Sequence, residues 1–285
     1  ASACEIVISM EAQASDTQAE VLSLHWDDVL IMGDEQTDDI REVAGNLNRE
    51  DIACFIYTSG TGGRPKGVML THGSILANCY SAYDLLLDFG LGDEVFLSLL
   101  PLSHSYEHTA GLFFPISIGA QIYYAEGPDK IAANLQEVRP TIMTAVPRLY
   151  EVLHDRIRRS VEQAGGSKAK LFARAIELGK KRHEAPGAMA FRERVTNVVL
   201  DLLVRKKVSR RFGGRLKTFV SGGAALNPDI GNFFLSLGIS ILQGYGQTEA
   251  SPVISCNRPD KTRIETVGPA LVGVEIKIAG DGEIL

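Results

Sequence analysis

The sequence contains four cysteines in 285 residues, and they are far apart. Cys4, Cys54, Cys79 and Cys256 form no Cys-x-x-Cys pair. Their small number and wide spacing argue against a disulfide framework and against a zinc site. We therefore expect reduced thiols in a cytoplasmic protein.

The sequence also lacks repeats, low-complexity tracts and any apolar run long enough to span a bilayer. Its most apolar long segment runs from Leu112 to Tyr124 and is interrupted by Pro115, Gly119 and Gln121. A membrane-spanning class is thereby excluded, and we expect this segment to lie in the core.

An overall excess of positive charge is missing too. The formal charge is −6 and the pI is about 5.6, which argues against nucleic acid as the main partner. Between Tyr150 and Lys217, however, 18 Lys/Arg stand against 7 Asp/Glu, a local charge of +11 that leaves −17 for the rest. A solvated helical face is the ordinary explanation, and peripheral contact with an anionic membrane at its inner face is the alternative.

What the sequence does contain is an alternation of strand and helix patterns with enough apolar residues, 45%, for a substantial core. This alternation predicts an α/β fold of layered, mostly parallel sheets flanked by helices. The predicted strands are 52–58, 68–70, 95–100, 120–124, 141–146, 216–220 and 239–242; the predicted helices are 72–88, 130–138, one from Pro147, 168–182, 191–211 and one from Pro228. The basic helices interrupt the alternation and indicate an insertion at about 148–215.

Three polar, glycine-bearing segments follow predicted strands: Tyr57–Gly67, Ser221–Leu226 and Gln243–Glu249. Ligands bind at the carboxyl ends of strands in open α/β sheets, so we expect these segments to form one site. The first segment combines hydroxyls, glycines and a lysine, which suits a polyphosphate, although such clusters also make ordinary turns. It is neither a Walker A loop nor a dinucleotide fingerprint, because Pro65 occupies a position that both patterns reserve for another residue.

Tyr57–Gly67 resembles the phosphate loop of the adenylate-forming superfamily, which includes acyl-CoA synthetases, luciferases and the adenylation domains of peptide synthetases. That loop reads Tyr-Thr-Ser-Gly-Thr-Thr-Gly-x-Pro-Lys-Gly, and only Gly62 departs from it. Gly244–Glu249, Ser221–Leu226 and Leu100–His104 resemble three further motifs of the superfamily, in the same order. The segments 101–107 and 146–151, together with the helical insertion, are most similar to long-chain fatty acid–CoA ligases.

The resemblance implies that a carboxylate attacks the α-phosphate of ATP and that the acyl group then passes to CoA, with Mg²⁺ as the metal. Glu249 and Thr58 would hold the metal, and Lys66, His104, Thr248 and Glu249 would be the catalytic residues. The implied nucleotide-binding residues are Thr58, Ser59, Gly60, Thr61, Gly62, Gly63, Lys66, Gly222, Gly223, Ala224, Ala225, Gly244, Tyr245, Gly246, Gln247 and Thr248. Within this set Tyr245 would stack on adenine, with Gly244 and Gly246 permitting its close approach, and Gly222 and Gly223 would face adenine or the acyl chain.

Both ends of the sequence look cut, so we expect 1–285 to be part of the large N-terminal AMP-binding domain of such an enzyme. The extreme N-terminal part and a C-terminal domain would then be absent, and this fragment would be nearly inactive. Two alternatives remain open: an enzyme that adenylates aryl or amino acids, and a non-catalytic nucleotide-binding module. At single residues, Lys66 and Glu249 could be ordinary surface charges, Tyr245 a core aromatic residue and His104 a half-buried side chain.

Overall fold

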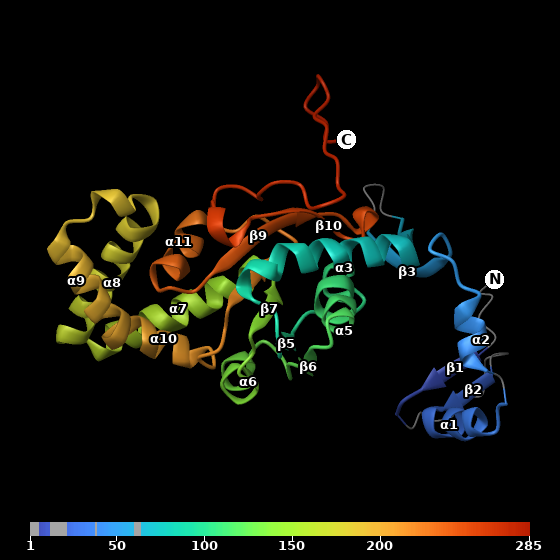
Figure 1. The fold of residues 1–285 in the computed structure, drawn as a ribbon. Helices are drawn as coiled ribbons and strands as arrows, with labels where there is room; N and C mark the ends of the chain where they lie inside the picture. The colour runs from blue at the N-terminus through green and yellow to red at the C-terminus, as the bar shows by residue number, and fades with distance from the viewer. Residues whose placement is uncertain (1–5, 12–21, 38, 60–63) are drawn as a thin grey trace. The chain divides into compact units, whose positions relative to one another are not determined.

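The computed structural model describes residues 6–11, 22–37, 39–59 and 64–285, and the chain divides into two compact units, Ala1–Asn48 and Arg49–Leu285. In the first unit, β1 (Ile6–Ser9) pairs in parallel with β2 (Leu22–His25). Two helices follow, α1 (Trp26–Asp34) and α2 (Ile40–Gly45), each begun by a side chain that accepts a hydrogen bond from the first turn (Figure 1). None of the residues described in this unit is buried.

The second unit is built on a six-stranded sheet with the order β10-β9-β8-β7-β5-β6 (Figure 1). Its strands are β5 (Val95–Ser98), β6 (Gln121–Tyr124), β7 (Ile142–Ala145), β8 (Thr218–Ser221), β9 (Ile241–Gly246) and β10 (Val253–Cys256). All neighbours are parallel except β10, which runs antiparallel to β9. The predicted α/β fold with a mostly parallel sheet is confirmed.

The other helical segments are η1 (Leu87–Phe89), α4 (Ser105–Glu107), η2 (His108–Phe113), α5 (Phe114–Ser117), α6 (Ile131–Val138), η3 (Pro186–Ala188), η5 (Thr248–Ala250) and η6 (Pro259–Lys261). Among the helices of the described ranges, none combines the length and apolarity that crossing a bilayer requires.

Helices cover both faces of the sheet because its central strands are apolar on both sides. Phe96 and Ile142 belong to one buried cluster, which α3 (His72–Leu86) completes. The next residues, Leu97 and Met143, belong to the opposite cluster, which the helices of 147–236 complete. Adjacent residues of a strand point to opposite faces, so a strand in the middle of three layers is buried on both sides and is therefore mostly apolar.

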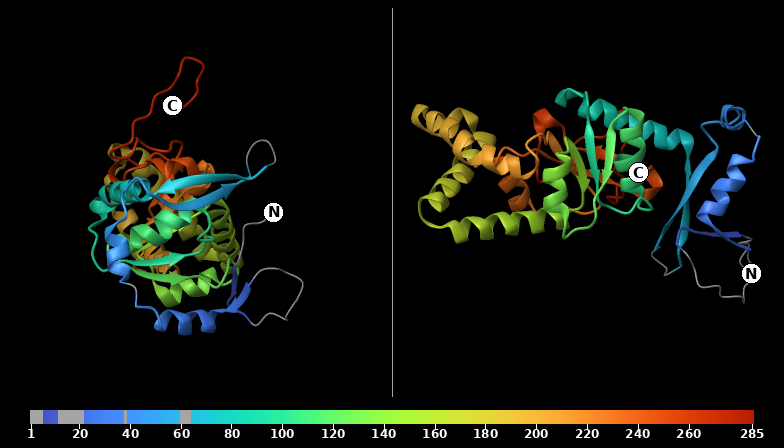
Figure 2. Two further views of the ribbon diagram at one scale, coloured as in Figure 1. Left: turned by 90° about the vertical axis from the view of Figure 1, so that its right-hand side faces the viewer. Right: turned by 90° about the horizontal axis from the view of Figure 1, so that it is seen from below.

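The predicted helical block consists of α7 (Pro147–Ala164), α8 (Gly166–Glu184), α9 (Phe191–Leu200), the π-helical turn η4 (Asp201–Arg205) and α10 (Lys206–Arg211). Helix α11 (Pro228–Ser236) contacts both α7 and α8, whereas α9 contacts α8 and η4 (Figures 1 and 2). Most basic side chains here are exposed, as expected of a solvated face. Arg205 is an exception: it is 5% exposed, and its guanidinium donates to the Ser236 carbonyl at 2.7 Å and to the Ala175 carbonyl at 2.6 Å.

Two expectations about local structure were wrong. The first glycine segment does not follow a strand of the parallel sheet, because β3 (Ile52–Thr58) and β4 (Lys66–Thr71) form a separate antiparallel pair. The segment is therefore the connection of a hairpin, with Thr58 opposite Lys66.

The second error concerns the segment after β9, which was expected to be a loop from Gln243 onward. Strand β9 continues to Gly246 because β10 folds back beside it, with Tyr245 opposite Ser255 and Gly244 opposite Cys256. The antiparallel partner satisfies the backbone groups of Gly244–Gly246, so this glycine-rich segment is extended.

Candidate active site

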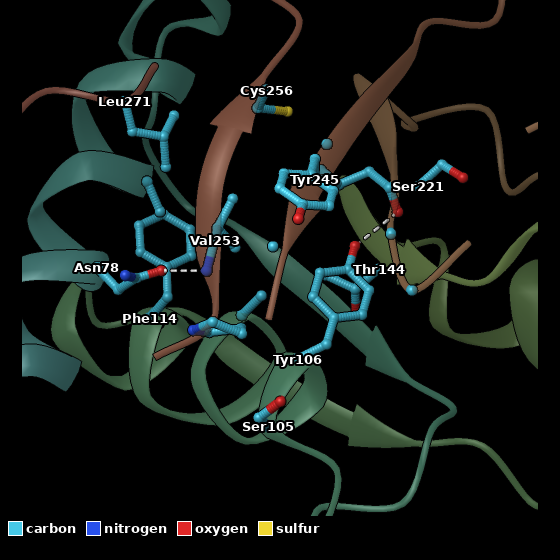
Figure 3. Close-up of a pocket in the computed structure, with 18 of the residues that line it drawn as sticks. Asn78, Ser105, Tyr106, Phe114, Thr144, Ser221, Tyr245, Val253, Cys256 and Leu271 are labelled. Atoms are coloured by element: carbon cyan, nitrogen blue, oxygen red, sulfur yellow. Dashed lines mark hydrogen bonds between the residues drawn. The ribbon is translucent and has the colours of Figure 1, made fainter. Parts of the chain in front are cut away.

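A cavity of about 220 Å³ lies at the carboxyl ends of the parallel strands (Figure 3). Of the predicted site residues, the structure brings together His104, Gly222, Gly223, Gly244, Tyr245, Gly246, Gln247 and Thr248 as lining residues. Three of the four segments singled out in the sequence therefore meet at one place, because β5, β8 and β9 end on the same edge of the sheet.

The two ends of this cavity differ in character. His104, Gln247 and Gly223 are exposed, so they mark the side that opens to solvent. The other lining side chains include a buried apolar group: Leu85, Leu86, Phe96, Phe114, Ile142 and Leu271. The cavity can thus hold a molecule with one polar and one apolar part.

Ser105 and Thr248 connect two of the predicted motifs. Their hydroxyl oxygens lie 3.0 Å apart, and both side chains line the cavity. Thr248 begins η5 and is half-buried, whereas the next residue, Glu249, is exposed. This places a hydroxyl inside the cavity and a carboxylate next to it along the chain.

His104 caps the N-terminus of the short helix α4 through its ring nitrogen Nδ1. The backbone N–H of Tyr106 donates to Nδ1 of His104 at 3.2 Å. A neutral imidazole that accepts at Nδ1 carries its proton on Nε2, so His104 can donate from Nε2 to a ligand in the cavity.

Tyr106 of α4 and Gly222, the residue after β8, lie side by side in the cavity wall. The Tyr106 hydroxyl donates to the Val220 carbonyl at 2.9 Å (Figure 3), and burial raises the pKa of this hydroxyl well above its usual range. A Cβ on Gly222 would lie 3.0 Å from Cζ of Tyr106. The Tyr106 ring therefore leaves little room for a side chain at Gly222, and this packing is a reason for glycine in addition to the predicted approach of adenine or an acyl chain.

Packing also explains why a glycine occupies position 246. A Cβ at this position would lie 2.0 Å from the Pro252 carbonyl oxygen, so the absence of a side chain allows the chain to turn back from η5 into β10. Tyr245 lies between Gly244 and Gly246 and lines the cavity, and its hydroxyl accepts a hydrogen bond from Nε2 of Gln247 at 2.8 Å. The core-aromatic alternative for Tyr245 is not what the structure shows, because this ring is half-buried at a cavity wall.

The hairpin β3–β4 lies against the segments that form this site. Strand β4 contacts η5, and Sγ of Cys54 on β3 lies 3.5 Å from Nε2 of His108, four residues after His104. Thr58, Ser59 and Lys66 stand at the ends of the hairpin strands. The remaining predicted phosphate-loop residues, Gly60, Thr61, Gly62 and Gly63, lie outside the described residues.

The other predicted residues do not line the cavity. Ala224 and Ala225 are exposed beyond Gly223, and Glu249 is exposed beyond Thr248. In the part of the chain that the structure describes, no group of three His, Cys, Asp or Glu side chains could hold a metal ion. Mg²⁺ commonly takes one or two protein carboxylates and completes its shell with water and substrate phosphates, so Glu249 fits a metal that arrives with a nucleotide.

Sequence reasoning missed Asn78 on α3, which fixes the segment carrying Thr248. Its Nδ2 donates to the Ala250 carbonyl at 3.1 Å, and its Oδ1 accepts from the Val253 backbone N–H at 2.9 Å (Figure 3). The signal was a polar residue three positions after Ile75, on the buried side of a helix.

Glu107 was missed as well. It is fully buried beneath the cavity, where Ser98 of β5 donates to one carboxyl oxygen at 2.6 Å and Thr144 of β7 donates to the other at 2.8 Å. Burial raises the pKa of this carboxyl above its ordinary value, although the two hydroxyl donors act in the opposite direction. Glu107 ties together the two strands whose ends form the floor of the site.

Solved structures show the same fold. The chain resembles the crystal structure of VinN with a TM-score of 0.63 and 22% identity, covering 99% of this chain and 60% of that one. It also resembles an anthranilate CoA ligase, AuaEII, solved with anthranoyl-AMP, with a TM-score of 0.57 and 21% identity over 84% of this chain and 37% of that one. At these identities the likeness concerns the fold.

Proteins related to the chain by sequence have a higher identity to it than these solved structures do. The human long-chain-fatty-acid–CoA ligase ACSBG2 is 33% identical over 87% of this chain and 38% of its own length. Long chain acyl-CoA synthetase 7 of Arabidopsis thaliana is 36% identical over 80% of this chain and 32% of its own length. The chain therefore spans about two fifths or less of these relatives. The model of the AMP-binding enzyme family matches residues 2–284, and the chain belongs to that family.

Proposed function

We propose that this chain belongs to a ligase that activates a fatty acid with ATP and transfers the acyl group to CoA. The observation that carries this proposal is that one cavity combines two characters: hydroxyls and glycine-bearing strand ends at its open side, and buried apolar side chains inside. An acyl adenylate has the same two parts. The sequence similarity to long-chain fatty acid–CoA ligases supports the same assignment.

In this proposal the chain's own residues bind and orient two anions. The β- and γ-phosphates are held by Thr58, Ser59, Thr61, Lys66 and the glycines 60, 62 and 63. The Thr248 hydroxyl donates to the α-phosphate. Tyr245 packs against adenine. A Mg²⁺ ion held by Glu249 and Thr58 would supply positive charge at the phosphates. His104 orients the attacking carboxylate by donating from Nε2.

Ser105 has a supporting role in the same scheme. Its hydroxyl fixes the rotamer of Thr248 through their 3.0 Å contact, so that the Thr248 hydroxyl points in one direction when substrate arrives. Preorganised donors are more effective than mobile ones because they need not reorient during the reaction.

A second candidate is an aryl acid–CoA ligase, and the size of the cavity favours it. About 220 Å³ is below the usual range of roughly 300–1,000 Å³ for ligand pockets, so a compact acid fits more readily than a long chain. A long acyl chain would require the buried apolar side chains, Phe114 above all, to move aside.

A ladder of acids in an ATP–pyrophosphate exchange assay separates the two candidates, and it is run on the full-length parent protein because the 285-residue chain alone is expected to be nearly inactive. The fatty-acid proposal predicts exchange with dodecanoate to octadecanoate and none with benzoates or amino acids. Exchange confined to benzoates would replace it with the aryl candidate. MgATP binding without exchange for any acid would support the non-catalytic alternative.

A further inference from the structure

The segment from α9 to η4 exposes an apolar stripe that covers no core of the described chain. Phe191, Val195, Val198 and Leu202 recur every three or four residues and are 79%, 51%, 61% and 61% exposed. Val199 and Leu203 widen this stripe, with exposures of 47% and 46%. We call these six residues the outer stripe. Amphipathic helices of globular proteins normally turn such a stripe toward the core.

Here the core-facing side of the same segment is a different set of residues. Asn197, Leu200, Val204 and Val208 are buried, and Arg205 between them anchors the segment to α8 and α11. Helix α8 contacts α11, and α9 contacts α8, so α9 is the outermost layer of the helical block (Figures 1 and 2). The outer stripe therefore faces away from the sheet.

The charged residues of 191–211 that lie outside the two ion pairs described next are all basic. Glu193 is paired with Lys181 at 2.7 Å, and Asp201 is paired with Arg205 at 2.6 Å, and they are the acidic residues of 191–211. Arg192 and Arg194 flank the start of the stripe, and four exposed basic residues follow its end: Lys206, Lys207, Arg210 and Arg211. The ion pairs on the inner side thus leave a basic surplus on the outer side.

We propose that the outer stripe is a docking surface for an anionic lipid membrane. Its apolar side chains would enter the boundary between headgroups and acyl chains, and the adjoining Lys and Arg residues would bind the negative headgroups. A second copy of the chain fits less well, because it would bring two surfaces of the same charge together. The proposal rests on this surface alone and does not depend on the proposed reaction.

Vesicle flotation with the 285-residue chain tests the proposal. We expect binding to vesicles of phosphatidylcholine mixed with phosphatidylglycerol, weak binding to pure phosphatidylcholine, and a decrease in binding as salt rises. Lys206→Gln with Lys207→Gln should lower partitioning to the anionic vesicles by roughly 30-fold. Val198→Asp with Leu202→Asp should lower it by at least about tenfold.

Two matched controls lie outside the helical block. Ile278 is 61% exposed, like Val198 and Leu202, and Ile278→Asp should leave partitioning unchanged. Lys261→Gln with Lys277→Gln removes two exposed charges elsewhere and should have little effect. Should the variant with Val198→Asp and Leu202→Asp fail to keep the wild-type circular dichroism spectrum, Val195→Ser with Leu202→Ser takes its place.

Absence of binding to anionic vesicles would overturn the proposal, as would equal losses in the stripe variants and the controls. Analytical ultracentrifugation without lipid tests the other candidate for this surface, a second copy of the chain, by measuring the oligomeric state. If the stripe variants convert a dimer to a monomer and leave vesicle binding intact, the stripe is an interface between copies of the chain and the proposal is wrong.

Discussion

The hydroxyls of Ser105 and Thr248 lie 3.0 Å apart although 143 positions separate the two residues in the sequence. Ser105 follows the motif Leu100–His104 after β5, and Thr248 belongs to the motif Gly244–Glu249, which begins in β9. The contact joins these motifs at the cavity, and it assigns different tasks to the two hydroxyls. Thr248 faces the ligand in our proposal, and Ser105 orients Thr248.

This division of tasks predicts unequal effects of substitution on MgATP binding. Thr248→Val should weaken binding by roughly ten- to hundredfold, since it removes a hydrogen bond to a charged group. Ser105→Ala should weaken it by about three- to tenfold, because only the orientation of Thr248 is lost. Isothermal titration calorimetry measures both, with exposed Ser103→Ala as the control. Equal affinities in Ser105→Ala and Ser103→Ala would contradict the orienting role.

Asn78 should matter for stability as well as for the site. Asn78→Leu leaves the Ala250 carbonyl and the Val253 N–H without their partner, and we expect a loss of about 2–4 kcal/mol in the free energy of unfolding. Ser81→Ala on the same helix removes one donor, to the Val272 carbonyl, and should cost about 1 kcal/mol. Urea titration gives both values. A similar loss in the two variants would show that Asn78 has no special role in holding η5 and β10.

Gly246 should not tolerate a methyl group. In Gly246→Ala the new Cβ would lie 2.0 Å from the Pro252 oxygen, so β9 and β10 must separate, at a cost of about 1–3 kcal/mol. Gly92 has no heavy atom within 4 Å of such a Cβ, and Gly92→Ala should change stability by less than about 0.5 kcal/mol. Thermal unfolding of the pair checks this, and a Gly246→Ala protein as stable as the wild type would refute the packing explanation.

The buried carboxyl of Glu107 predicts a pH dependence with a definite sign. Its pKa is raised in the folded state by burial, so the folded protein binds this proton more tightly than the unfolded chain does. The corresponding stability is fully present below the ordinary glutamate pKa and is lost as pH rises through the raised value.

Glu107→Gln should remove this contribution and flatten the profile across that interval. The free energy of unfolding, measured by urea titration at several pH values, compares the two proteins. Glu137→Gln, on an exposed helical position, serves as the control. An unchanged slope in Glu107→Gln would mean that the pKa of the Glu107 carboxyl is the same in the folded and unfolded states, and it would contradict the raised value.

Much of the fold follows from local patterns. The segment 95–100 is a short, almost wholly apolar run, which is typical of a strand buried on both faces, and all four residues of β5 are buried. The breaks of the helical block at Gly165 and Pro186, and the cap that Asn227 provides for α11, are also typical of these residue types. In each of these cases neighbouring residues determine the structure.

The errors concern partners that are distant in sequence. The residues of Gln243–Gly246 do not indicate that β10 pairs with them. The residues of β3 likewise do not indicate that β3 pairs with β4 alone. Asn78 and Glu107 were overlooked because their bonding partners come from other strands and turns. At Gly222 and Gly246 distant residues add a packing reason for glycine, because a Cβ would lie 3.0 Å from the Tyr106 ring and 2.0 Å from the Pro252 oxygen.

The central claim is that Thr248 binds a nucleotide in this cavity and that Glu249, exposed beside the cavity, binds the Mg²⁺ that arrives with it. Calorimetric titration of ATP with and without Mg²⁺, on the wild type and on Glu249→Gln, tests it most directly. We predict that Mg²⁺ strengthens ATP binding to the wild type by about tenfold or more and has little effect on Glu249→Gln. Equal enhancement by Mg²⁺ in both proteins would contradict the assignment of Glu249, and no binding of MgATP to the wild type would contradict the account of the site.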